Sequence, residues 1–389
     1  MLTTNFSKET SASLHKKYKL SSKNIKNMDK IILLSLIAIV LFGILNIYIS
    51  TKGKSSPTFY LQKQFIWFII SLVSLYFMLL INYRTLFNYA PLFYWGGITL
   101  LVITKLFGAD IGGGRRWLVF GPISFQTTEI IKICVIIMIA KKLEEFDNDI
   151  NTFKNLLIVA LYVTLPCLFI FTQPDLGMTI VVCFMVFSML YISGLDMRIV
   201  LVGGIILISL FTICWNSGII QDYQKKRVTS FINPSANTAD AGYHLSQSLI
   251  AIGAGGLSGT RPSLENDGRT SYAGQHVPEV QTDFIFAAIA EQFGFLGGAS
   301  LLSLFGVLIG HMINIAKTAK DTFGSTLSVG IISYFLLAIL QNVGMTIGLT
   351  PISGITLPLV SYGGSSLLTS ILCIGLVMNI GMRREKISF

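Results

Sequence analysis

Long apolar runs separated by short polar segments follow one another along almost the whole chain. A helix of roughly 20 apolar residues is long enough to cross a bilayer. The pattern therefore predicts an all-α membrane protein, a polytopic bundle of about ten transmembrane helices with one large extracellular loop. The runs cover residues 31–50, 64–82, 86–107, 125–140, 155–172, 177–193, 199–216, 283–316, 325–349 and 361–381.

The composition excludes a soluble globular protein. Of the 389 residues, 52% are hydrophobic and only 12% are charged, and the mean hydropathy is +0.69. A soluble domain carries roughly 25% charged residues. The net charge of +10 is also compatible with nucleic-acid binding, but seven of the 29 Lys and Arg residues lie in segment 1–30. Basic residues that gather on cytoplasmic segments explain the charge better, so no nucleic-acid partner is expected.

The distribution of Lys and Arg also sets the predicted orientation. An even number of spans puts both termini on one side, and placing that side in the cytoplasm gives the inner segments more Lys and Arg than the outer ones. The predicted domains are a Lys-rich cytoplasmic tail, 1–30, expected to be disordered, a transmembrane domain, 31–382, and a short cytoplasmic tail, 383–389. Residues 217–282 are expected to form the large extracellular loop between helices seven and eight.

Three segments depart from plain spanning helices. Segment 108–124 is Gly-rich and contains a Gly-Pro turn, which indicates a loop. Residues 251–259, within the large loop, are too Gly-rich for a stable span, and segment 348–366 holds two prolines and four glycines. All three face outward in the predicted topology. Irregular backbone at membrane depth needs protein groups or a water-filled cavity to satisfy its N–H and C=O groups. The pattern therefore suggests a cavity open to the outer leaflet.

Asp283 is the most informative acidic residue, because it stands at the threshold of run 283–316, directly before Phe-Ile-Phe. A carboxylate that enters the membrane needs a partner or a function. One interpretation is an ordinary helix start, with Thr282 as the N-cap. The other is a general base, since partial burial raises the pKa of a carboxyl and makes it a better proton acceptor. Nearby Glu279 and the adjoining loop favour the second interpretation.

Two pairs of charged residues lie at the outer ends of other runs. Glu129 and Lys132 are three residues apart, so they share a helix face and form either a structural ion pair or part of a site. Arg115 and Arg116 precede a tryptophan and serve either as interfacial anchors or as phosphate ligands.

Two further acids have simpler interpretations. Asp175 begins a run, where an acid is an ordinary helix-start residue. Glu291 lies inside run 283–316 and must face protein or water rather than lipid. The histidines and cysteines are scattered without the spacing of a zinc site, so the sequence leaves the metal content unknown.

Six motifs follow one another in order along the chain. They are Gly114-Arg-Arg-Trp-Leu118 with Gln126-Thr-Thr-Glu129, Gln173-Pro-Asp-Leu-Gly177, Gly242-Tyr-His-Leu-Ser-Gln-Ser248, Pro278-Glu-Val-Gln-Thr-Asp-Phe-Ile-Phe286, Asn342-Val-Gly-Met345 and Ser361-Tyr-Gly-Gly-Ser-Ser366. In this order they resemble the SEDS family (shape, elongation, division and sporulation), most closely its elongation branch. The resemblance extends from the first run to the last. The chain departs from the family at Thr127, where Pro is usual, at Gln281, where many relatives have His, and at Gln292, where a second acid is common.

The resemblance implies a peptidoglycan glycosyltransferase at the outer face of the bacterial cytoplasmic membrane. Such proteins join lipid II, an undecaprenyl-diphosphate-linked disaccharide peptide, into glycan strands for cell elongation and rod shape. The family's essential acid matches Asp283, which would deprotonate the 4-hydroxyl of the acceptor sugar or hold a divalent cation (Mg or Mn) that does so. The hydroxyl attacks the anomeric carbon of the donor, and the lipid diphosphate leaves with inversion. Arg115, Arg116 and Lys132 are the candidates to neutralise the leaving group.

The resemblance also implies a wider site and a set of partners. The expected partner is a class B penicillin-binding protein, a single-span transpeptidase, together with other proteins of the elongation or division complex. Expected structural residues are Asp175, Glu291, Pro351, Gly363 and Gly364. Expected substrate-binding residues are Arg115, Arg116, Glu129, Lys132, Gln247, Ser248, Glu279, Thr282, Ser361, Tyr362 and Ser365.

Other functions remain as alternatives. A flippase for lipid-linked precursors is also a many-helix bundle with intramembrane charges. It should carry ionisable residues through both leaflets and broken helices in two matching halves, whereas the candidate residues here cluster toward the outside. A non-enzymatic scaffold would leave the buried charges without a purpose. The division and sporulation branches of the same family are the remaining alternative.

Overall fold

The structure, a computed structural model, describes most of the chain. Its described residues are 27–52, 57–110, 114–121, 123–147, 149–173, 175–218, 225, 231, 241–260 and 271–384. Most of the predicted tail 1–30, most of the predicted tail 383–389 and about half of the predicted loop 217–282 therefore lie outside the described residues.

Every one of the ten predicted apolar runs is a helix, which confirms the fold class. Seven of the helices within the described residues are long and apolar enough by length and composition to cross a membrane. The three others, α6, α8 and α9, correspond to the predicted runs 125–140, 177–193 and 199–216. The ten helices are α3 (Lys30–Thr51), α4 (Pro57–Leu80), α5 (Tyr83–Phe107), α6 (Thr127–Glu145), α7 (Phe153–Thr172), α8 (Leu176–Ile192), α9 (Met197–Asn216), α13 (Ile285–Lys317), α14 (Thr322–Thr346) and α15 (Gly364–Met382).

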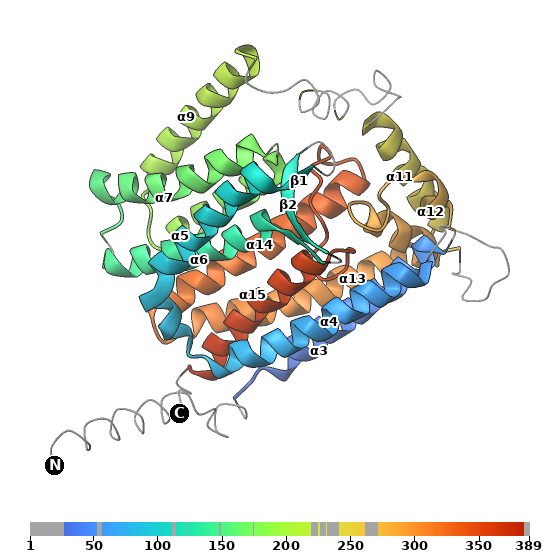
Figure 1. Cartoon of the computed structure of the whole chain (residues 1–389), viewed down its shortest axis with the longest axis horizontal. Coiled ribbons are helices and arrows are strands. Elements are labelled where there is room, and N and C mark those ends of the chain that lie inside the picture. Colours follow the sequence, from blue (N-terminus) through green and yellow to red (C-terminus); the bar gives the residue numbers. More distant parts are fainter. Residues whose placement is uncertain are drawn as a thin grey trace.

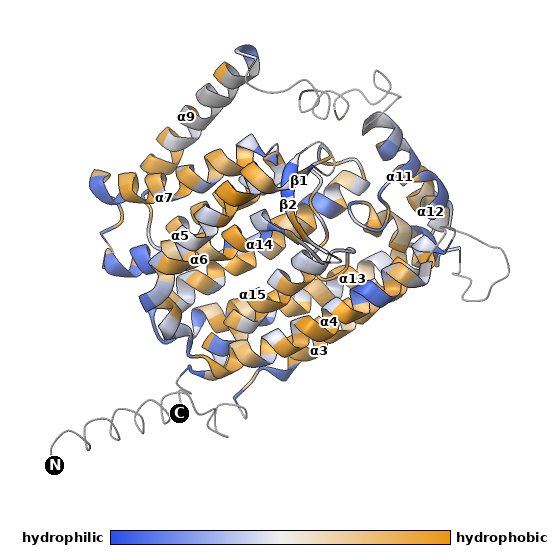
Figure 2. Ribbon diagram, in the orientation of Figure 1, coloured by the Kyte–Doolittle hydropathy of each residue, from blue (hydrophilic) through white to orange (hydrophobic). Residues whose placement is uncertain are grey.

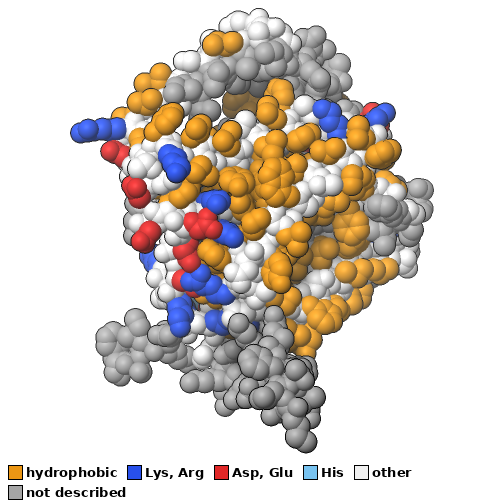
Figure 3. Space-filling model, turned by 60° about the vertical axis from the view of Figure 1, so that its left-hand side comes forward, with side chains coloured by type: hydrophobic (Ala, Val, Ile, Leu, Met, Phe, Trp, Pro, Cys, Tyr) orange, Lys and Arg blue, Asp and Glu red, His pale blue; other side chains and the backbone are white. Residues whose placement is uncertain are grey.

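The helices form one bundle with α14 and α15 at its centre. In the most apolar stretch of α15, 89% of residues are buried, against 17% for α7 at the periphery. Figure 1 shows α3, α4, α13 and α15 running side by side, while α9 stands apart from the bundle. Apolar residues cover the helices along their length (Figure 2), and apolar side chains cover much of the face in Figure 3, with most charges gathered along one edge. This is the surface of a multi-pass membrane protein.

The predicted loop 108–124 is instead a small antiparallel sheet. Strands β1 (Ala109–Asp110), β2 (Arg115–Phe120) and β3 (Ile123–Gln126) pair in that order. Trp117 lies opposite Gln126, and Gly121 makes the turn with φ of 59°, a left-handed conformation that glycine adopts without strain. The strands are too short to give an alternating pattern in the sequence, so only the turn was predictable. Because β3 leads directly into α6, the sheet is fixed to the bundle.

Part of the predicted extracellular loop 217–282 packs into the bundle as helices α11 (Ala241–Gly255) and α12 (Tyr272–His276). Helix α13 breaks at Gly294, where φ is 64° and ψ is −164°. The backbone groups freed by the break pair with the end of α11: Phe295 N–H donates to the Gly256 carbonyl (2.9 Å) and Thr260 N–H donates to the Glu291 carbonyl (2.9 Å). The glycines of 251–259, predicted only to prevent a span, thus let this segment approach the break.

Both ends of the described chain lie at the same end of the bundle. The Asp29 carboxylate, just before α3, is hydrogen-bonded to His311 Nδ1 of α13 (2.9 Å). Arg384 donates to the Thr318 hydroxyl just past α13 (3.0 Å). Partial burial alone would raise the pKa of Asp29. The hydrogen bonds with His311 and with the amide of Ile32 outweigh it and hold that pKa below its usual value.

The contact between α11 and α13 yields a matched test. A Cβ at Gly255 would lie 1.9 Å from the Ala290 carbonyl oxygen, whereas a Cβ at Gly253, two residues away on the same helix, meets nothing within 4 Å. We expect Gly255→Ala to destabilise the protein by about 1–3 kcal/mol through overpacking. We expect Gly253→Ala to be neutral or slightly stabilising, because Ala favours helix. Thermal unfolding of the purified protein checks both, and equal melting temperatures for the two variants would contradict the packing.

Candidate active site

Asp283 lies in a turn, not in a helix. Residues 278–284 form consecutive turns, and α13 begins only at Ile285, with Phe284 at the N-cap position and no side-chain cap. The interpretation in which Thr282 caps this helix is therefore wrong. Its hydroxyl instead donates to the Glu279 carbonyl (3.0 Å), within the turn. The side chain of Asp283 is half-buried, so the carboxylate is partly withdrawn from solvent without being enclosed.

Three hydrogen bonds to successive carbonyls hold this turn. The Gln281 carbonyl accepts from Tyr362 N–H (2.8 Å), and the Thr282 carbonyl accepts from the Ser361 hydroxyl (2.6 Å). The Asp283 carbonyl accepts from the Asn342 amide (2.8 Å). We call these three bonds the carbonyl clamp. Because they reach the turn from α14 and from the segment before α15, the clamp fixes the backbone of Asp283 against two other parts of the chain.

The segment before α15 is itself tightly held. Residues 351–363 contain no helix or strand, and we call them the 351–363 loop. The Ser361 hydroxyl accepts from Leu357 N–H (2.8 Å), and Asn342 donates to the Ile355 carbonyl (2.8 Å) as well as to the turn. Gln64 of α4 donates to the Ser361 carbonyl (3.2 Å) and accepts from Gly363 N–H (3.2 Å). Irregular backbone inside an apolar bundle is stable only when protein groups satisfy it in this way.

The predicted structural residues in and just after this loop differ in their contacts. A Cβ at Gly364 would lie 2.1 Å from the Trp67 ring, so glycine is required where α15 meets α4. Gly363 contributes the amide that bonds Gln64. Pro351 is exposed at the start of the loop, away from these contacts. Tyr362 places its half-buried ring against Tyr60, with ring centroids 5.2 Å apart.

Glu279 supplies a second carboxylate to the turn. It is exposed, with φ of 51°, a conformation that is uncommon for a residue with a side chain. Its carboxylate accepts from the Gln281 amide (3.1 Å) and from the Thr282 hydroxyl (3.3 Å). Such strain concentrates at functional sites. Within the described part of the chain, no group of three or more His, Cys, Asp or Glu side chains is placed to hold a metal ion.

Glu129 and Lys132 form an ion pair inside the bundle, as one of the two interpretations predicted. Lys132 is fully buried and Glu129 is 3% exposed. Glu129 also accepts from the Thr369 hydroxyl of α15 (2.9 Å), and the ammonium lies 3.6 Å from the ring centre of Tyr334 in α14. The pair thus joins α6, α14 and α15. Because Lys132 is sealed in this position, the expectation that it contacts a leaving diphosphate is not supported, and the structural interpretation is favoured.

The two arginines of β2 differ in their surroundings. Arg115 is exposed. Arg116 forms an ion pair with Asp175 (3.8 Å), which also caps α8 by accepting from Met178 N–H (3.1 Å). The start of α8 touches the 351–363 loop, since a Cβ at Gly177 would lie 2.7 Å from the Ser353 carbonyl oxygen. The sheet is also joined to the start of α15, because Gln126 N–H at the end of β3 donates to the buried Ser365 hydroxyl (3.4 Å).

The remaining predicted residues hold α11 and α12 in place. The buried Glu291 carboxylate accepts from Tyr272 N–H (2.6 Å), Ala273 N–H (2.8 Å) and the Ser271 hydroxyl (2.8 Å), which fixes the start of α12. Glu291 therefore faces protein, as predicted. Gln247 accepts from the Tyr272 hydroxyl (2.6 Å), and the buried Ser248 donates to the Thr346 carbonyl (2.8 Å). These contacts are internal to the protein.

Sequence analysis missed the amide side chains that organise the site. Asn342 lay within a quoted motif but was given no role, and Gln64 was not singled out. Both are fully buried, and each bonds two backbone groups. The available signal was an amide at the start of an apolar run (Gln64) or within one (Asn342), which is unfavourable unless the amide has partners.

Comparison with known proteins agrees with this arrangement. Residues 26–386 match the FtsW, RodA and SpoVE family, described as "Cell cycle protein". The peptidoglycan glycosyltransferase MrdB of Escherichia coli (strain K12) is 35% identical over 368 residues, which cover 93% of this chain and 95% of that protein. Stage V sporulation protein E of Bacillus subtilis (strain 168) is 34% identical over 327 residues, which cover 83% of this chain and 87% of that protein.

Solved structures agree as well. One, described as "Structural coordination of polymerization and crosslinking by a peptidoglycan synthase complex", superposes with a TM-score of 0.79 at 28% identity and covers 92% of this chain and 99% of that chain. The crystal structure of the rod shape determining protein RodA of Thermus thermophilus superposes with a TM-score of 0.68 at 27% identity. The match covers 92% of this chain and 97% of that chain. The chain belongs to the FtsW, RodA and SpoVE family, so the resemblance to SEDS proteins is confirmed.

The buried ion pair gives a second matched test. Lys132→Met leaves Glu129 as an uncompensated buried charge and should destabilise the protein by about 3–5 kcal/mol, and a second change, Glu129→Gln, should restore much of that loss. Lys142 and Glu145 have the same spacing on the same helix but are partly exposed, 2.7 Å apart. Their double-mutant cycle should give about 0.5 kcal/mol or less. Denaturation in detergent measures both couplings, and equal values would show that burial does not strengthen the inner pair.

Proposed function

We propose that this chain is a peptidoglycan glycosyltransferase that joins lipid II units into glycan strands, for cell elongation and rod shape, at the outer face of the bacterial cytoplasmic membrane. The observation that carries the proposal is the half-buried carboxylate of Asp283 on a turn held by the carbonyl clamp. Family membership indicates the reaction in which that carboxylate would take part. The relatives named MrdB and RodA are peptidoglycan glycosyltransferases and match over 93% of this chain, which supports the elongation branch.

In the proposed reaction, Asp283 is the general base. Its carboxylate takes the proton from the 4-hydroxyl of the acceptor sugar while that oxygen attacks the anomeric carbon of the donor. The new glycosidic bond forms as the bond from the anomeric carbon to the lipid diphosphate breaks, which inverts the configuration. A base must lie within hydrogen-bond reach of the proton it removes, and a fixed turn keeps it there without further loss of entropy. This is the contribution of the clamp.

The leaving diphosphate carries negative charge that the protein has to stabilise. Of the three predicted cations, Arg115 is the exposed one, on β2, and Arg116 lies next to it with Asp175 as a partner. Lys132 is withdrawn into its buried pair. Guanidinium groups suit this role, since their paired donors match phosphate oxygens. The β2–β3 hairpin is therefore proposed as the element that receives the diphosphate.

A divalent cation is compatible with the turn but not required by it. Magnesium is usually held by one or two carboxylates, with water and substrate phosphates as the other ligands. Asp283 and Glu279 are the carboxylates that would hold Mg or Mn, and the ion would supply charge neutralisation of the leaving group. The other substrate-binding candidates keep the positions described above. Thr282 directly precedes Asp283, Tyr362 donates its N–H to the Gln281 carbonyl, and Ser361 is used inside the clamp.

The proposed partner is a class B penicillin-binding protein that crosslinks the product, together with other proteins of the elongation or division complex. The similar structure described as a peptidoglycan synthase complex of polymerization and crosslinking supports this. The proposed topology has both termini, with tails 1–30 and 383–389, in the cytoplasm and segment 217–282 outside. The positions of Asp29 and Arg384 at one end of the bundle support it.

A transporter is less well supported. Among the described helices, only α13 contains non-helical backbone within it, at Gly294, and no second broken helix matches it. Transporters with inverted repeats place broken helices in both halves. The charged candidate residues also gather around the 351–363 loop and the hairpin, and not along a route from one end of the bundle to the other.

Replacement of the base tests the proposed function. Asp283→Asn should lower glycan synthesis from lipid II by about 100-fold or more, because general-base catalysis contributes that much. The variant should remain folded, since the clamp uses the backbone carbonyl of this residue and Asn keeps the size of the side chain. The assay is strand synthesis by the purified protein with its transpeptidase. Asp149→Asn, an exposed change near the other end of the bundle, is the control. Normal synthesis by a folded Asp283→Asn variant would refute the assignment.

The clamp has its own test. Ser361→Ala removes the hydroxyl that bonds both the turn and Leu357, and should lower kcat by about tenfold or more, because misplacement of a catalytic group by a fraction of an ångström is enough. KM for lipid II should change little, whereas a direct substrate contact would raise KM. Ser353→Ala in the same loop is the control, since that hydroxyl makes only a 3.8 Å contact with the Met345 sulfur. Equal kcat values for both variants would argue against a positioning role.

A further inference from the structure

Cys167 of α7 and Cys183 of α8 bring their sulfur atoms into contact. The two Sγ atoms lie 3.9 Å apart, close enough for a weak S–H···S hydrogen bond. Neither Cys134 nor Cys373, the other cysteines whose side chains the structure describes, makes such a contact with a second sulfur. The spacing along the chain does not reveal this pair, because its members lie on two helices.

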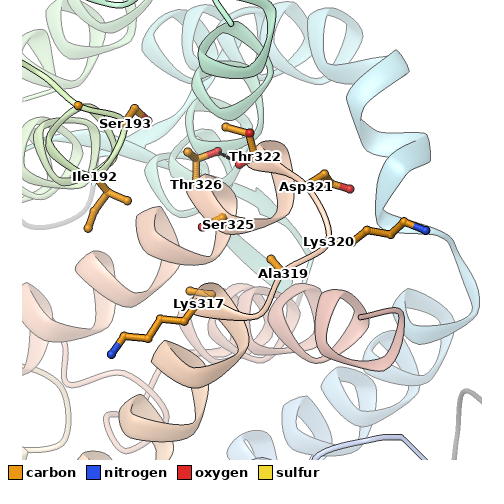
Figure 4. Close-up of a pocket in the computed structure, with 11 residues that line it drawn as sticks. Ile192, Ser193, Lys317, Ala319, Lys320, Asp321, Thr322, Ser325 and Thr326 are labelled. Atoms are coloured by element: carbon orange, nitrogen blue, oxygen red, sulfur yellow. Dashed lines mark hydrogen bonds between the residues drawn. The ribbon is translucent and has the colours of Figure 1, made fainter. Parts of the chain in front are cut away.

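Both sulfurs lie in the half of the bundle that holds the candidate active site. Cys167 is five residues from the end of α7, and Cys183 is seven residues from the start of α8. At roughly 1.5 Å per residue, they lie about 8–10 Å from the turn that joins these helices. The start of α8 adjoins the 351–363 loop, whereas its far end reaches a cavity lined by Ile192 and Ser193 (Figure 4). In the proposed topology the pair therefore lies in the outer leaflet.

The two thiols differ in their access to the bilayer. Cys183 is exposed, beside Phe184, which is 36% exposed, so this part of α8 contacts lipid. Cys167 is only partly exposed. A reagent dissolved in the outer leaflet therefore reaches the Cys183 sulfur first, with the Cys167 sulfur in contact with it.

Helix α7 is locally adaptable beside Cys167. A disulfide requires the two sulfurs to approach by about 2 Å, to a bond of roughly 2.05 Å. Pro166 lies inside α7 and has no N–H, so the Tyr162 carbonyl lacks its helical donor and instead accepts from the Tyr94 hydroxyl (2.9 Å). Helices bend most readily at such positions. The sulfurs can therefore meet without displacement of the rest of the bundle.

We propose that Cys167 and Cys183 are a reversible redox pair, in which a neutral oxidant of the hypohalous-acid class attacks Cys183 and Cys167 then closes a disulfide. The bilayer selects this class of oxidant. Disulfide exchange starts from a thiolate, and an apolar environment disfavours the charged sulfur. A hypohalous acid is small and uncharged, so it can enter the outer leaflet.

The reaction balances in two steps. The Cys183 thiol and hypochlorous acid give a sulfenyl chloride and water. The Cys167 sulfur then attacks the Cys183 sulfur, the S–Cl bond breaks as the S–S bond forms, and the Cys167 proton leaves with chloride. The two thiols lose two electrons, which reduce the chlorine of hypochlorous acid to chloride.

The contact with Cys167 determines the fate of Cys183. An oxidised cysteine without a neighbouring thiol proceeds to sulfinic and sulfonic acid, which are not restored by thiol reductants, whereas a thiol in contact captures it as a disulfide. A sulfonate on the lipid-facing side of α8 would place a permanent charge in the bilayer, which is unfavourable. The pair thus protects the α7–α8 hairpin. This role is independent of the proposed polymerase reaction, so its failure would leave the role of Asp283 untouched.

The test identifies the oxidation products. The full chain in nanodiscs of saturated phosphatidylcholine is treated with hypochlorous acid, digested and analysed by mass spectrometry. We expect a disulfide-linked α7–α8 peptide that a thiol reductant separates. In Cys167→Ala, Cys183 should carry at least about tenfold more sulfinic and sulfonic acid than in the unaltered protein, because the resolving thiol is missing. Cys134→Ala removes a buried cysteine that lacks such a contact and is the control, with the linked peptide unchanged.

The reverse variant and an internal monitor complete the test. In Cys183→Ala, the less exposed Cys167 should stay largely reduced. Met197, which is 56% exposed, reports that the oxidant was active, because it is converted to the sulfoxide. With Met197 oxidised, equal over-oxidation of Cys183 in the unaltered protein and in Cys167→Ala would overturn the proposal. An unmodified Cys183 in the unaltered protein would also overturn it, and this result does not depend on the folding of any variant.

Discussion

The carbonyl clamp on residues 281–283 is the constraint on which the rest of this site depends. A turn placed between membrane-spanning helices has backbone groups that neither a helix nor water satisfies, and each unmet group is unfavourable. Tyr362, Ser361 and Asn342 satisfy three successive carbonyls. The same bonds that make the turn stable therefore also fix the position of Asp283. Stability and catalytic geometry have a single physical cause here.

Helix α13, which follows the turn, also has backbone groups that distant parts of the chain satisfy. Helix α13 is broken at Gly294, and the end of α11 supplies the partners for its freed backbone groups. Three residues before the break, the Glu291 carboxylate receives the first amides of α12. A buried carboxylate with several donors is stable without a counter-charge. Helices α11 and α12 are thus attached to α13 by hydrogen bonds at two points.

The sequence predicted those features that depend on local periodicity and missed those that depend on distant partners. Apolar runs gave all ten helices, the spacing of Glu129 and Lys132 gave their ion pair, and the position of Asp175 gave its cap. The interpretation of Thr282 as a helix N-cap was wrong, because a turn and a helix start have the same local composition. The break at Gly294 and the contacts of the Gln64 and Asn342 amides join residues that lie far apart in the chain, which no local pattern records. The strands of the β2–β3 hairpin are close in the chain but too short to show an alternating pattern.

The most direct measurement is a structure of the unaltered protein bound to lipid II and a donor analogue that cannot react. The account predicts that a carboxylate oxygen of Asp283 lies about 2.6–3.2 Å from the 4-hydroxyl oxygen of the acceptor sugar, with the carbonyl clamp intact. It also predicts that the diphosphate lies against the β2–β3 hairpin. An acceptor hydroxyl more than about 6 Å from Asp283 with no bridging water, or a clamp opened by substrate, would contradict the account.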